Sequence, residues 1–110
     1  MTTPLTLNTD RGVDGTPRVI AAGEIDISNI HVFNEALTTA SEGSRRPITV
    51  DMSAVKYLDS AGINALFKHA DEIDRLHLIV HPFLMRVLTI SGLVQLANVQ
   101  PAPTPGNGDR

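Results

Sequence analysis

The sequence predicts an α/β protein: a single domain with a mixed, mostly parallel sheet of about four to five strands and about three helices packed on it. Its length of 110 residues is enough for one buried core. Short apolar or β-branched runs alternate with segments of helical periodicity, and this order favours parallel strands joined by right-handed crossovers. Gly, Pro and Asp residues separate these runs, as expected for short connections.

The N-terminal part predicts a β-hairpin. Strands are expected around Leu5 to Leu7 and over Arg18 to Ala22, because both are apolar runs bounded by turn residues. Asp10 to Pro17 supplies the Gly, Asp and Pro of the turn between them. The segment Gly23-Glu24-Ile25-Asp26 then closes the second strand before a helix opens.

Two helices are predicted on either side of a strand over Ile48 to Met52. The first is capped by Asp26 or Ser28 and ends at Gly43. Its buried stripe is expected to comprise Ile30, Phe33, Leu37 and Ala40. The second begins at Ser60, and its inward face is expected to comprise Ile63, Leu66, Phe67, Ala70 and Ile73.

The C-terminal part predicts a strand over Leu76 to Val80, a short helix over Phe83 to Ser91 and a last strand over Leu93 to Val99. Gly92 is expected to adopt the left-handed conformation that ends many helices. The inward side chains of the short helix should be Leu84, Val87 and Leu88. We assign residues 1–99 to the domain and residues 100–110, which are rich in Pro and Gly, to a disordered tail.

Composition and charge exclude several classes of site and partner. The chain has no cysteine, which removes disulfides, zinc–thiolate sites and cysteine nucleophiles. A formal net charge of -3 argues against direct binding of nucleic acid, which requires a basic face. Neither a secretory leader nor an apolar run long enough to span a bilayer is visible, so we expect a soluble, cytoplasmic protein without membrane insertion.

Ser60 is the residue of greatest chemical interest, because it lies where a strand is followed by a helix. Its hydroxyl is a good helix N-cap, and Asp59 adds negative charge beside the positive end of the helix dipole. A hydrolase nucleophile is disfavoured, since the nucleophile elbow requires Gly two residues earlier and this sequence has Leu58 there. Two roles for Ser60 remain open: a helix cap with no further function, and a phosphoacceptor. The second is plausible because a phosphate beside acidic residues changes the local charge strongly.

The acidic residues and histidines do not indicate catalysis or metal binding. Asp26 and Asp59 each end a strand of the same predicted sheet and are expected near one another, but solvated capping carboxylates explain them more simply than a catalytic pair. His77 and His81 would lie about 13 Å apart along a strand, which is too far for one metal ion. We therefore predict no metal, no cofactor and no enzyme activity.

Three motifs resemble those of a known family. The segment Val50 to Leu66, VDMSAVKYLDSAGINAL, resembles the signature of the STAS domain in bacterial anti-anti-sigma factors, in which a strand like V-D-L-S is followed by a spacer, D-S-[ST/A]-G-L and a helix. Gly23-Glu24-Ile25-Asp26 resembles the G-E-[LI]-D before the first helix of that family, and Ile90-Ser91-Gly92-Leu93 resembles its later S/T-G-L. The resemblance covers about Arg18 to Leu93, with Ala61 where many members have Ser or Thr.

The resemblance implies an anti-sigma factor antagonist that is regulated by phosphorylation. Ser60 matches the phosphoacceptor, which a partner anti-sigma factor of the serine-kinase type modifies with its own ATP and magnesium; a phosphatase is the implied opposing partner. The unphosphorylated protein would bind the kinase and free a sigma factor, and the phosphoprotein would let the kinase go. The implied partner-binding residues are Glu24, Asp26, Ile27, Ser28, Asn29, Asp59, Ser60, Ala61, Gly62, Ile63 and Asn64.

The alternative is a STAS module that is not phosphorylated and serves as a regulatory subunit of a membrane or lipid transport complex. Such a subunit would not use Ser60 as an acceptor. In both interpretations this chain binds a partner and is not itself an enzyme.

Overall fold

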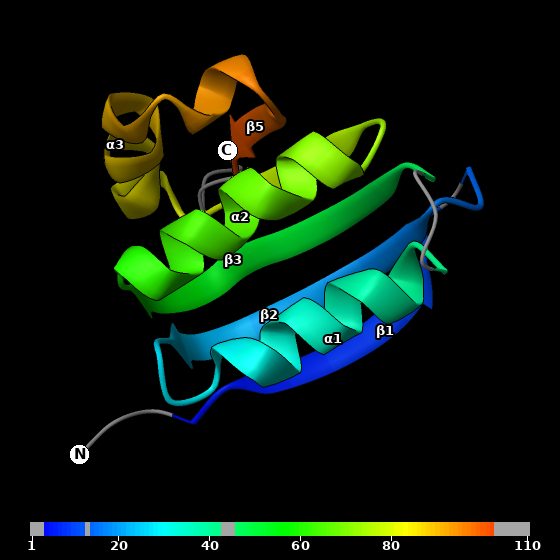
Figure 1. The fold of residues 1–110 in the computed structure, drawn as a ribbon, viewed down its shortest axis with the longest axis horizontal. Helices are drawn as coiled ribbons and strands as arrows, with labels where there is room; N and C mark the ends of the chain where they lie inside the picture. The colour runs from blue at the N-terminus through cyan, green and yellow to red at the C-terminus, as the bar shows by residue number, and fades with distance from the viewer. Residues whose placement is uncertain (1–3, 13, 43–45, 103–110) are drawn as a thin grey trace, which may run out of the picture.

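A five-stranded sheet with the strand order β1-β2-β3-β4-β5 forms the scaffold of the computed structural model, which describes residues 4–12, 14–42 and 46–102 (Figure 1). The strands are β1 (Thr6–Arg11), β2 (Pro17–Ile25), β3 (Ile48–Leu58), β4 (Leu76–Val80) and β5 (Asn98–Pro101). β1 is antiparallel to β2, and the other three pairs are parallel. The predicted fold class and the predicted hairpin are confirmed.

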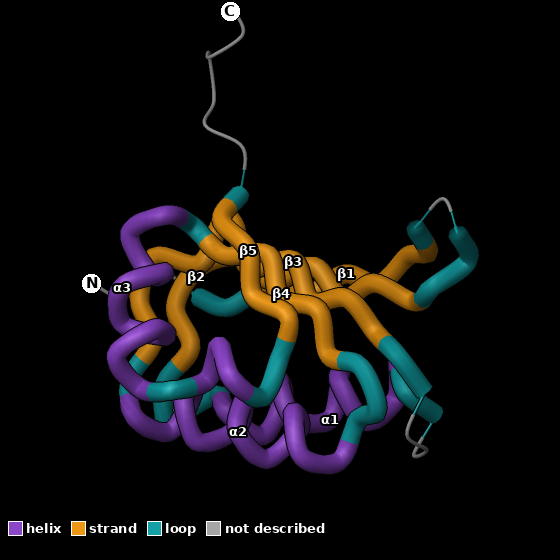
Figure 2. The backbone as a smooth tube through the Cα atoms, turned by 90° about the horizontal axis from the view of Figure 1, so that it is seen from above, coloured by secondary structure: helices purple, strands orange, loops and turns teal. Residues whose placement is uncertain are grey.

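The helices are α1 (Ile30–Ala40), α2 (Ser60–Glu72), α3 (Pro82–Ser91) and a short 3₁₀ turn, η1 (Leu93–Gln95). Because successive strands are neighbours and crossovers between parallel strands are right-handed, the crossover helices lie on one face of the sheet. Figure 2 shows α1 and α2 side by side on that face. Among the helices of the described residues, none is long and apolar enough to cross a membrane.

The core lies between the sheet and its helices. Alternate residues of β3, beginning with Ile48, Val50 and Met52, are buried against the helix layer, as the period of two in a strand requires. Phe33 and Leu37 of α1 are fully buried opposite them. The predicted stripe of the first helix is thus confirmed at Phe33, Leu37 and Ala40, whereas Ile30 is only partly buried.

Two strands are longer than the sequence indicated. β2 continues to Ile25 instead of ending at Ala22, and β3 continues to Leu58 instead of Met52. The ends of the two strands pair with each other up to Ile25 and Leu58. The register of this pairing shifts twice, between Ile20 and Ala22 and between Gly23 and Glu24 of β2. In β3 the alternation of buried and exposed residues is lost beyond Met52, so the sequence pattern of a strand ends there, whereas β2 keeps the alternation to Ile25.

The C-terminal elements differ most from the prediction. Leu93 begins a 3₁₀ turn rather than a strand, and β5 extends to Pro101. β5 is a short edge strand with no fully buried residue, so its sequence has no apolar pattern that would predict a strand. It is a strand because it pairs with β4, and Pro101 is tolerated because it lies at the edge of the sheet. Gln100 and Pro101 of the predicted tail therefore belong to the sheet, while residues 103–110 and the predicted helix terminator Gly43 lie outside the described residues.

α3 has the predicted extent to within one residue, and Gly92 ends it with φ +89° as expected. Leu84 and Leu88 are buried, but Val87, which was also predicted to face inward, is exposed. The prediction failed because apolar residues surround most of the helix, with Arg86, Thr89 and Ser91 as its polar residues, so its sequence does not mark one inward face.

α2 buries a polar residue that the apolar pattern did not reveal. Its buried residues are Gly62, Ala65, Leu66 and His69, whereas the predicted Ile63, Phe67 and Ala70 are only partly buried; the predicted Ile73 is buried just after the helix. The side chain of His69 is 2% exposed, and its Nε2 lies 2.9 Å from Oδ1 of Asn34 on α1. Burial lowers the pKa of His69 and so favours the neutral imidazole in the folded protein.

This burial predicts a pH-dependent stability. The unfolded chain binds a proton at His69 near its ordinary pKa of about 6.5, whereas the folded chain binds it only at lower pH, so stability falls as the pH drops through this window. We expect the urea midpoint to fall between about pH 7.5 and about pH 5.5, and to fall less in His69→Gln. The matched control His31→Gln, at an exposed position of α1, should behave as wild type. Equal pH dependence in wild type and His69→Gln would refute this account.

Candidate functional site

The carboxylate of Asp59 joins two segments at the ends of β2 and β3. Its Oδ1 accepts a hydrogen bond from the amide of Gly62 at 3.1 Å, and its Oδ2 accepts one from the amide of Ile27 at 3.2 Å. The amide of Asp59 also donates to the carbonyl of Ile25 at 3.3 Å. These bonds bring the loop between β2 and α1 against the start of α2, so the predicted proximity of the two acidic motifs is confirmed.

Asp59, and not Ser60, is the N-cap of α2. The backbone of Asp59 is extended, with φ -91° and ψ -174°, and its side chain accepts the cap bond from Gly62, while Ser60 is the first helical residue. Serine and aspartate are similarly good caps, so the sequence alone does not rank them. The carboxylate prevails here because its two oxygens reach two amides, which a single hydroxyl cannot do from this position. The side chain of Ser60 is consequently left exposed to solvent.

The loop between β2 and α1 is held by its own polar side chains. Oδ1 of Asp26 accepts bonds from the amide of Ser28 at 2.9 Å and from its hydroxyl at 2.5 Å. Asn29 accepts a bond from the amide of Asp26 and donates to the carbonyl of Glu24, each at 2.9 Å. The hydrogen bond from Ser28 lowers the pKa of Asp26, so this carboxylate stays charged at neutral pH.

These bonds correct the predicted cap of the first helix. Asn29 occupies the N-cap position of α1 and makes no side-chain cap bond, while Asp26 and Ser28 bond to each other within the loop. The loop therefore uses its capping residues to fix its own shape, and Asn29 ties it back to β2.

Two glycines of the recognised motifs serve close packing. A Cβ atom on Gly62 would overlap Cδ1 of Leu58 and press on Ile25, so the absence of a side chain lets the first turn of α2 pack against the strand ends. Gly23 has φ +102°, and a Cβ there would overlap the carbonyl oxygen of Pro4. Both positions thus have a structural reason to be glycine.

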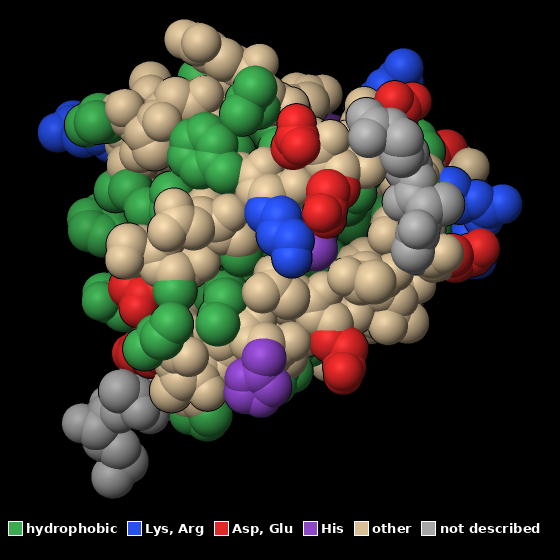
Figure 3. Space-filling model, in the orientation of Figure 1, with side chains coloured by type: hydrophobic (Ala, Val, Ile, Leu, Met, Phe, Trp, Pro, Cys, Tyr) green, Lys and Arg blue, Asp and Glu red, His purple; other side chains and the backbone are tan. Residues whose placement is uncertain are grey.

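The predicted partner-binding residues gather at one end of the molecule, but they are not equally accessible. Ile27, Ser28, Ser60 and Asn64 are exposed; Glu24, Asp26, Asn29, Asp59, Ala61 and Ile63 are partly buried; and Gly62 is buried. Gly62 therefore contributes packing and a backbone amide rather than a contact surface. In the space-filling view, acidic and hydrophobic side chains share the left margin of the molecule, where this end lies (Figure 3).

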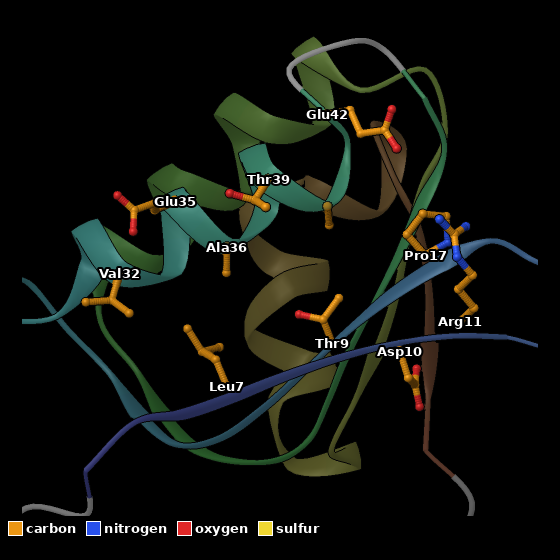
Figure 4. Close-up of a pocket in the computed structure, with 11 residues that line it drawn as sticks. Leu7, Thr9, Asp10, Arg11, Pro17, Val32, Glu35, Ala36, Thr39 and Glu42 are labelled. Carbon is orange, nitrogen blue, oxygen red and sulfur yellow. The ribbon is translucent and has the colours of Figure 1, made fainter.

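A separate groove of about 510 Å³ lies between β1 and α1 and does not involve these residues (Figure 4). Side chains of Leu7, Thr9, Val32 and Ala36 converge there from the two elements, with Asp10, Arg11, Glu35 and Glu42 also on its lining. Arg11 donates to the carbonyl of Gly15 at 2.8 Å, and Glu42 pairs with Arg46. None of the predicted partner-binding residues lines this groove.

Comparison with known proteins places the chain in a family. The model of the family described as "Mlab, STAS domain" matches residues 8–99, which include both strand ends and all of α1, α2 and α3. The chain belongs to the STAS domain family. The resemblance inferred from the motifs of Gly23 to Asp26 and Val50 to Leu66 is thereby confirmed.

Several solved structures share this fold. An anti-sigma factor antagonist from Mycobacterium paratuberculosis is 22% identical, with a TM-score of 0.81 over 93% of this chain and 92% of that one. The anti-sigma factor antagonist SpoIIAA in its unphosphorylated form is 18% identical, with a TM-score of 0.69 over 89% of each chain. The Bacillus cell fate determinant SpoIIAA in its phosphorylated form is 19% identical, with a TM-score of 0.66 over 89% of this chain and 92% of that one.

The double role of Asp59 predicts the effects of its replacement. Asp59→Ala removes the acceptor for both amides and should destabilise the fold by about 1–2 kcal/mol, as measured by urea denaturation. Faster hydrogen exchange at the amides of Gly62 and Ile27 should accompany the loss. Asp59→Asn is the matched control, since its one carbonyl oxygen still accepts from one amide, and it should lose less. Equal stability of Asp59→Ala and wild type would show that the carboxylate does not hold the two segments together.

Proposed function

We propose that this STAS domain is an anti-sigma factor antagonist that works in the cytoplasm by partner switching. Its unphosphorylated form binds an anti-sigma factor of the serine-kinase type and frees a sigma factor, without touching nucleic acid itself. The observation that carries the proposal is the exposed Ser60 at the start of α2, directly after a cap residue that leaves its hydroxyl available. The similarity of the fold to anti-sigma factor antagonists supports it.

The modification takes place at Oγ of Ser60. A bond forms between this oxygen and the γ-phosphorus of ATP, the bond from that phosphorus to ADP breaks, and the hydroxyl proton passes to a base on the kinase. ATP and magnesium belong to the kinase, so this chain is the substrate. A phosphatase would restore the hydroxyl by hydrolysis. The existence of a phosphorylated form of the similar Bacillus protein supports a modification on this fold.

Phosphorylation would act through charge. A phosphate adds about -1.5 to -2 charges at neutral pH. Asp59 already occupies the amide of Gly62, and Asp26 is held ionised in the adjoining loop, so the added charge meets two fixed carboxylates. A partner whose surface is complementary to the unmodified end would then be repelled by the phosphate, or would have to remove water from it, and the partner would dissociate.

The second candidate function is that of a regulatory subunit, not phosphorylated, in a membrane or lipid transport complex. The observation in its favour is that the matching family model is the one described as "Mlab, STAS domain". The two candidates differ at Ser60, because only the first requires its hydroxyl to accept a phosphate.

Phosphorylation in vitro tests the proposal. Incubation with ATP, magnesium and the serine-kinase anti-sigma factor of the same genome that binds this chain should add one phosphate to wild type, as measured by intact mass spectrometry. Ser60→Ala should remain unmodified, and Thr38→Ala, at an exposed hydroxyl residue of α1 outside the predicted partner-binding residues, should be modified normally. Modification that persists in Ser60→Ala, or a kinase that binds but transfers no phosphate, would contradict the proposed switch.

The electrostatic basis of release predicts the effect of a charge at position 60. Ser60→Asp should weaken binding to the kinase by about tenfold or more, and the loss should shrink in high salt. Ser60→Asn has nearly the same shape without the charge and is the matched control. Titration calorimetry at two salt concentrations measures both variants. If Ser60→Asn weakens binding as much as Ser60→Asp, the effect is steric and the electrostatic explanation is wrong.

A further inference from the structure

β1 is an edge strand whose outer side is open. The strand order places β1 and β5 at the two edges of the sheet. Proteins protect such edges with short strands, Pro or Lys, because unpaired amides and carbonyls there can pair with another chain. β5 has four residues and ends in Pro101. β1 has six residues, Thr6–Arg11, and contains neither Pro nor Lys, so it can accept a further strand.

The pairing of β1 with β2 determines which backbone groups of β1 face outward. In an antiparallel pair, every second residue exchanges its hydrogen bonds with the residue opposite, and the residues between direct their amides and carbonyls to the other side. Arg11 lies opposite Pro17, which has no amide hydrogen, so this pair is of the second kind. The next pair is of the first kind, since the amide of Gly12 donates to the carbonyl of Thr16 at 2.9 Å. The outward amides and carbonyls are therefore those of Leu7, Thr9 and Arg11.

The groove between β1 and α1 follows the same edge. The side chains of Leu7, Thr9 and Arg11 line it, together with residues of α1. Figure 4 shows Leu7 and Glu35 toward one end of the groove, and Arg11 and Glu42 toward the other. Paired strands direct opposite side chains to the same face of a sheet. A strand added to β1 would therefore point every second side chain into this groove.

A second copy of β1 matches these outward groups. Leu7, Thr9 and Arg11 are symmetric about Thr9, so two antiparallel copies related by a two-fold axis at Thr9 satisfy the outward amides and carbonyls of both. In this register Leu7 of each copy lies opposite Arg11 of the other, and Asn8 lies opposite Asp10 on the face away from the groove. The side-chain amide of Asn8 can donate to that carboxylate, so no like charges lie opposite each other.

Charge complementarity favours the same pairing. Because the two strands are antiparallel, the Arg11 end of one groove meets the Glu35 end of the other (Figure 4). Both side chains are exposed. Arg11 donates to the carbonyl of Gly15, and its guanidinium has further donors for a carboxylate. Glu42 pairs with Arg46 of its own chain, so its charge is already balanced.

The α1 helices of the two copies would also pack on each other. α1 contacts both β1 and β2. Neighbouring strands are about 4.8 Å apart, so helices placed over the β1–β2 pair of each copy would lie about 10 Å from one another, a usual distance between packed helices. Val32 on the groove lining, which is 43% exposed, would be covered by this contact.

We infer that this chain forms a homodimer in which β1 pairs with β1 of a second copy across a two-fold axis at Thr9. The pairing joins the two five-stranded sheets into one continuous sheet, with the α1 helices side by side on one face. The strand pairing supplies backbone hydrogen bonds, and the contact between Arg11 and Glu35 of the second copy fixes the register.

Sedimentation velocity over a wide range of concentrations tests the strand pairing. Wild type should sediment as a dimer, and Thr9→Pro should be monomeric because it removes the outward amide at the centre of the pairing. Since β2 does not use that amide, the variant should still fold, with a urea midpoint close to that of wild type. Thr9→Val keeps the amide and is the matched control, which should remain dimeric.

Charge reversal tests the register. Arg11→Glu and Glu35→Arg should each weaken the dimer by about tenfold, and the combination Arg11→Glu/Glu35→Arg should restore it, because the pair is then reversed. Arg86→Glu makes the same charge change at an exposed position of α3, which does not line the groove, and should leave the dimer unchanged.

The remaining outcomes overturn the inference. Wild type that stays monomeric at its highest soluble concentration does so and leaves the proposed function intact, because none of the predicted partner-binding residues lines the groove. A dimer that persists in Thr9→Pro, or charge reversals that do not compensate each other, would show that the copies meet through another surface. If circular dichroism shows that Thr9→Pro does not fold, the charge-reversal variants decide alone.

Discussion

The two hydrogen bonds accepted by the carboxylate of Asp59 organise the functional end of this protein. One oxygen holds the first turn of α2 through Gly62, and the other holds the loop after β2 through Ile27. Beside these bonds, the amide of Asp59 donates to the carbonyl of Ile25, and β2 pairs with β3 up to Ile25 and Leu58. Because Asp59 performs the capping, the exposed hydroxyl of Ser60 does not have to cap the helix. In the proposed function, the structural role therefore belongs to Asp59 and the regulatory role to its neighbour Ser60.

The surface around Ser60 combines charged and apolar side chains. Asp26 and Asp59 provide fixed charge beside Ser60, and in the proposed function a phosphate at Ser60 would add to that charge. The exposed side chain of Ile27 provides apolar area in the adjoining loop. Apolar burial is not directional and contributes to many complexes, whereas charge selects partners and states. The proposed switch would use both, since charge alone binds weakly in physiological salt and apolar area alone does not distinguish two states.

The sequence predicted the architecture because each main signal was local. β4 and the buried residues of α1 follow directly from apolar periodicity, and the motifs at Gly23 to Asp26 and at Asp59 to Gly62 identified the family. The failures have non-local causes. The extensions of β2 and β3 depend on pairing through shifted registers, and β5 depends on pairing with β4. The choice of Asp59 over Ser60 as the cap depends on Ile27, which is distant in the sequence. Val87 was misplaced because a helix that is apolar around most of its circumference has no clear inward face in its sequence.

The most direct measurement of the central role of Asp59 is a comparison of backbone amide chemical shifts, by NMR at neutral pH, between wild type, Asp59→Ala and Ser60→Ala. If one carboxylate binds both segments, the amide protons of Gly62 and Ile27 should both move upfield in Asp59→Ala and stay close to their wild-type positions in Ser60→Ala. The amide of Ser28, which donates to Asp26 instead, should keep its position in both variants. A Gly62 amide that is unchanged in Asp59→Ala and moves in Ser60→Ala would show that serine is the cap, and would contradict the account of Asp59 as the residue that joins the two segments.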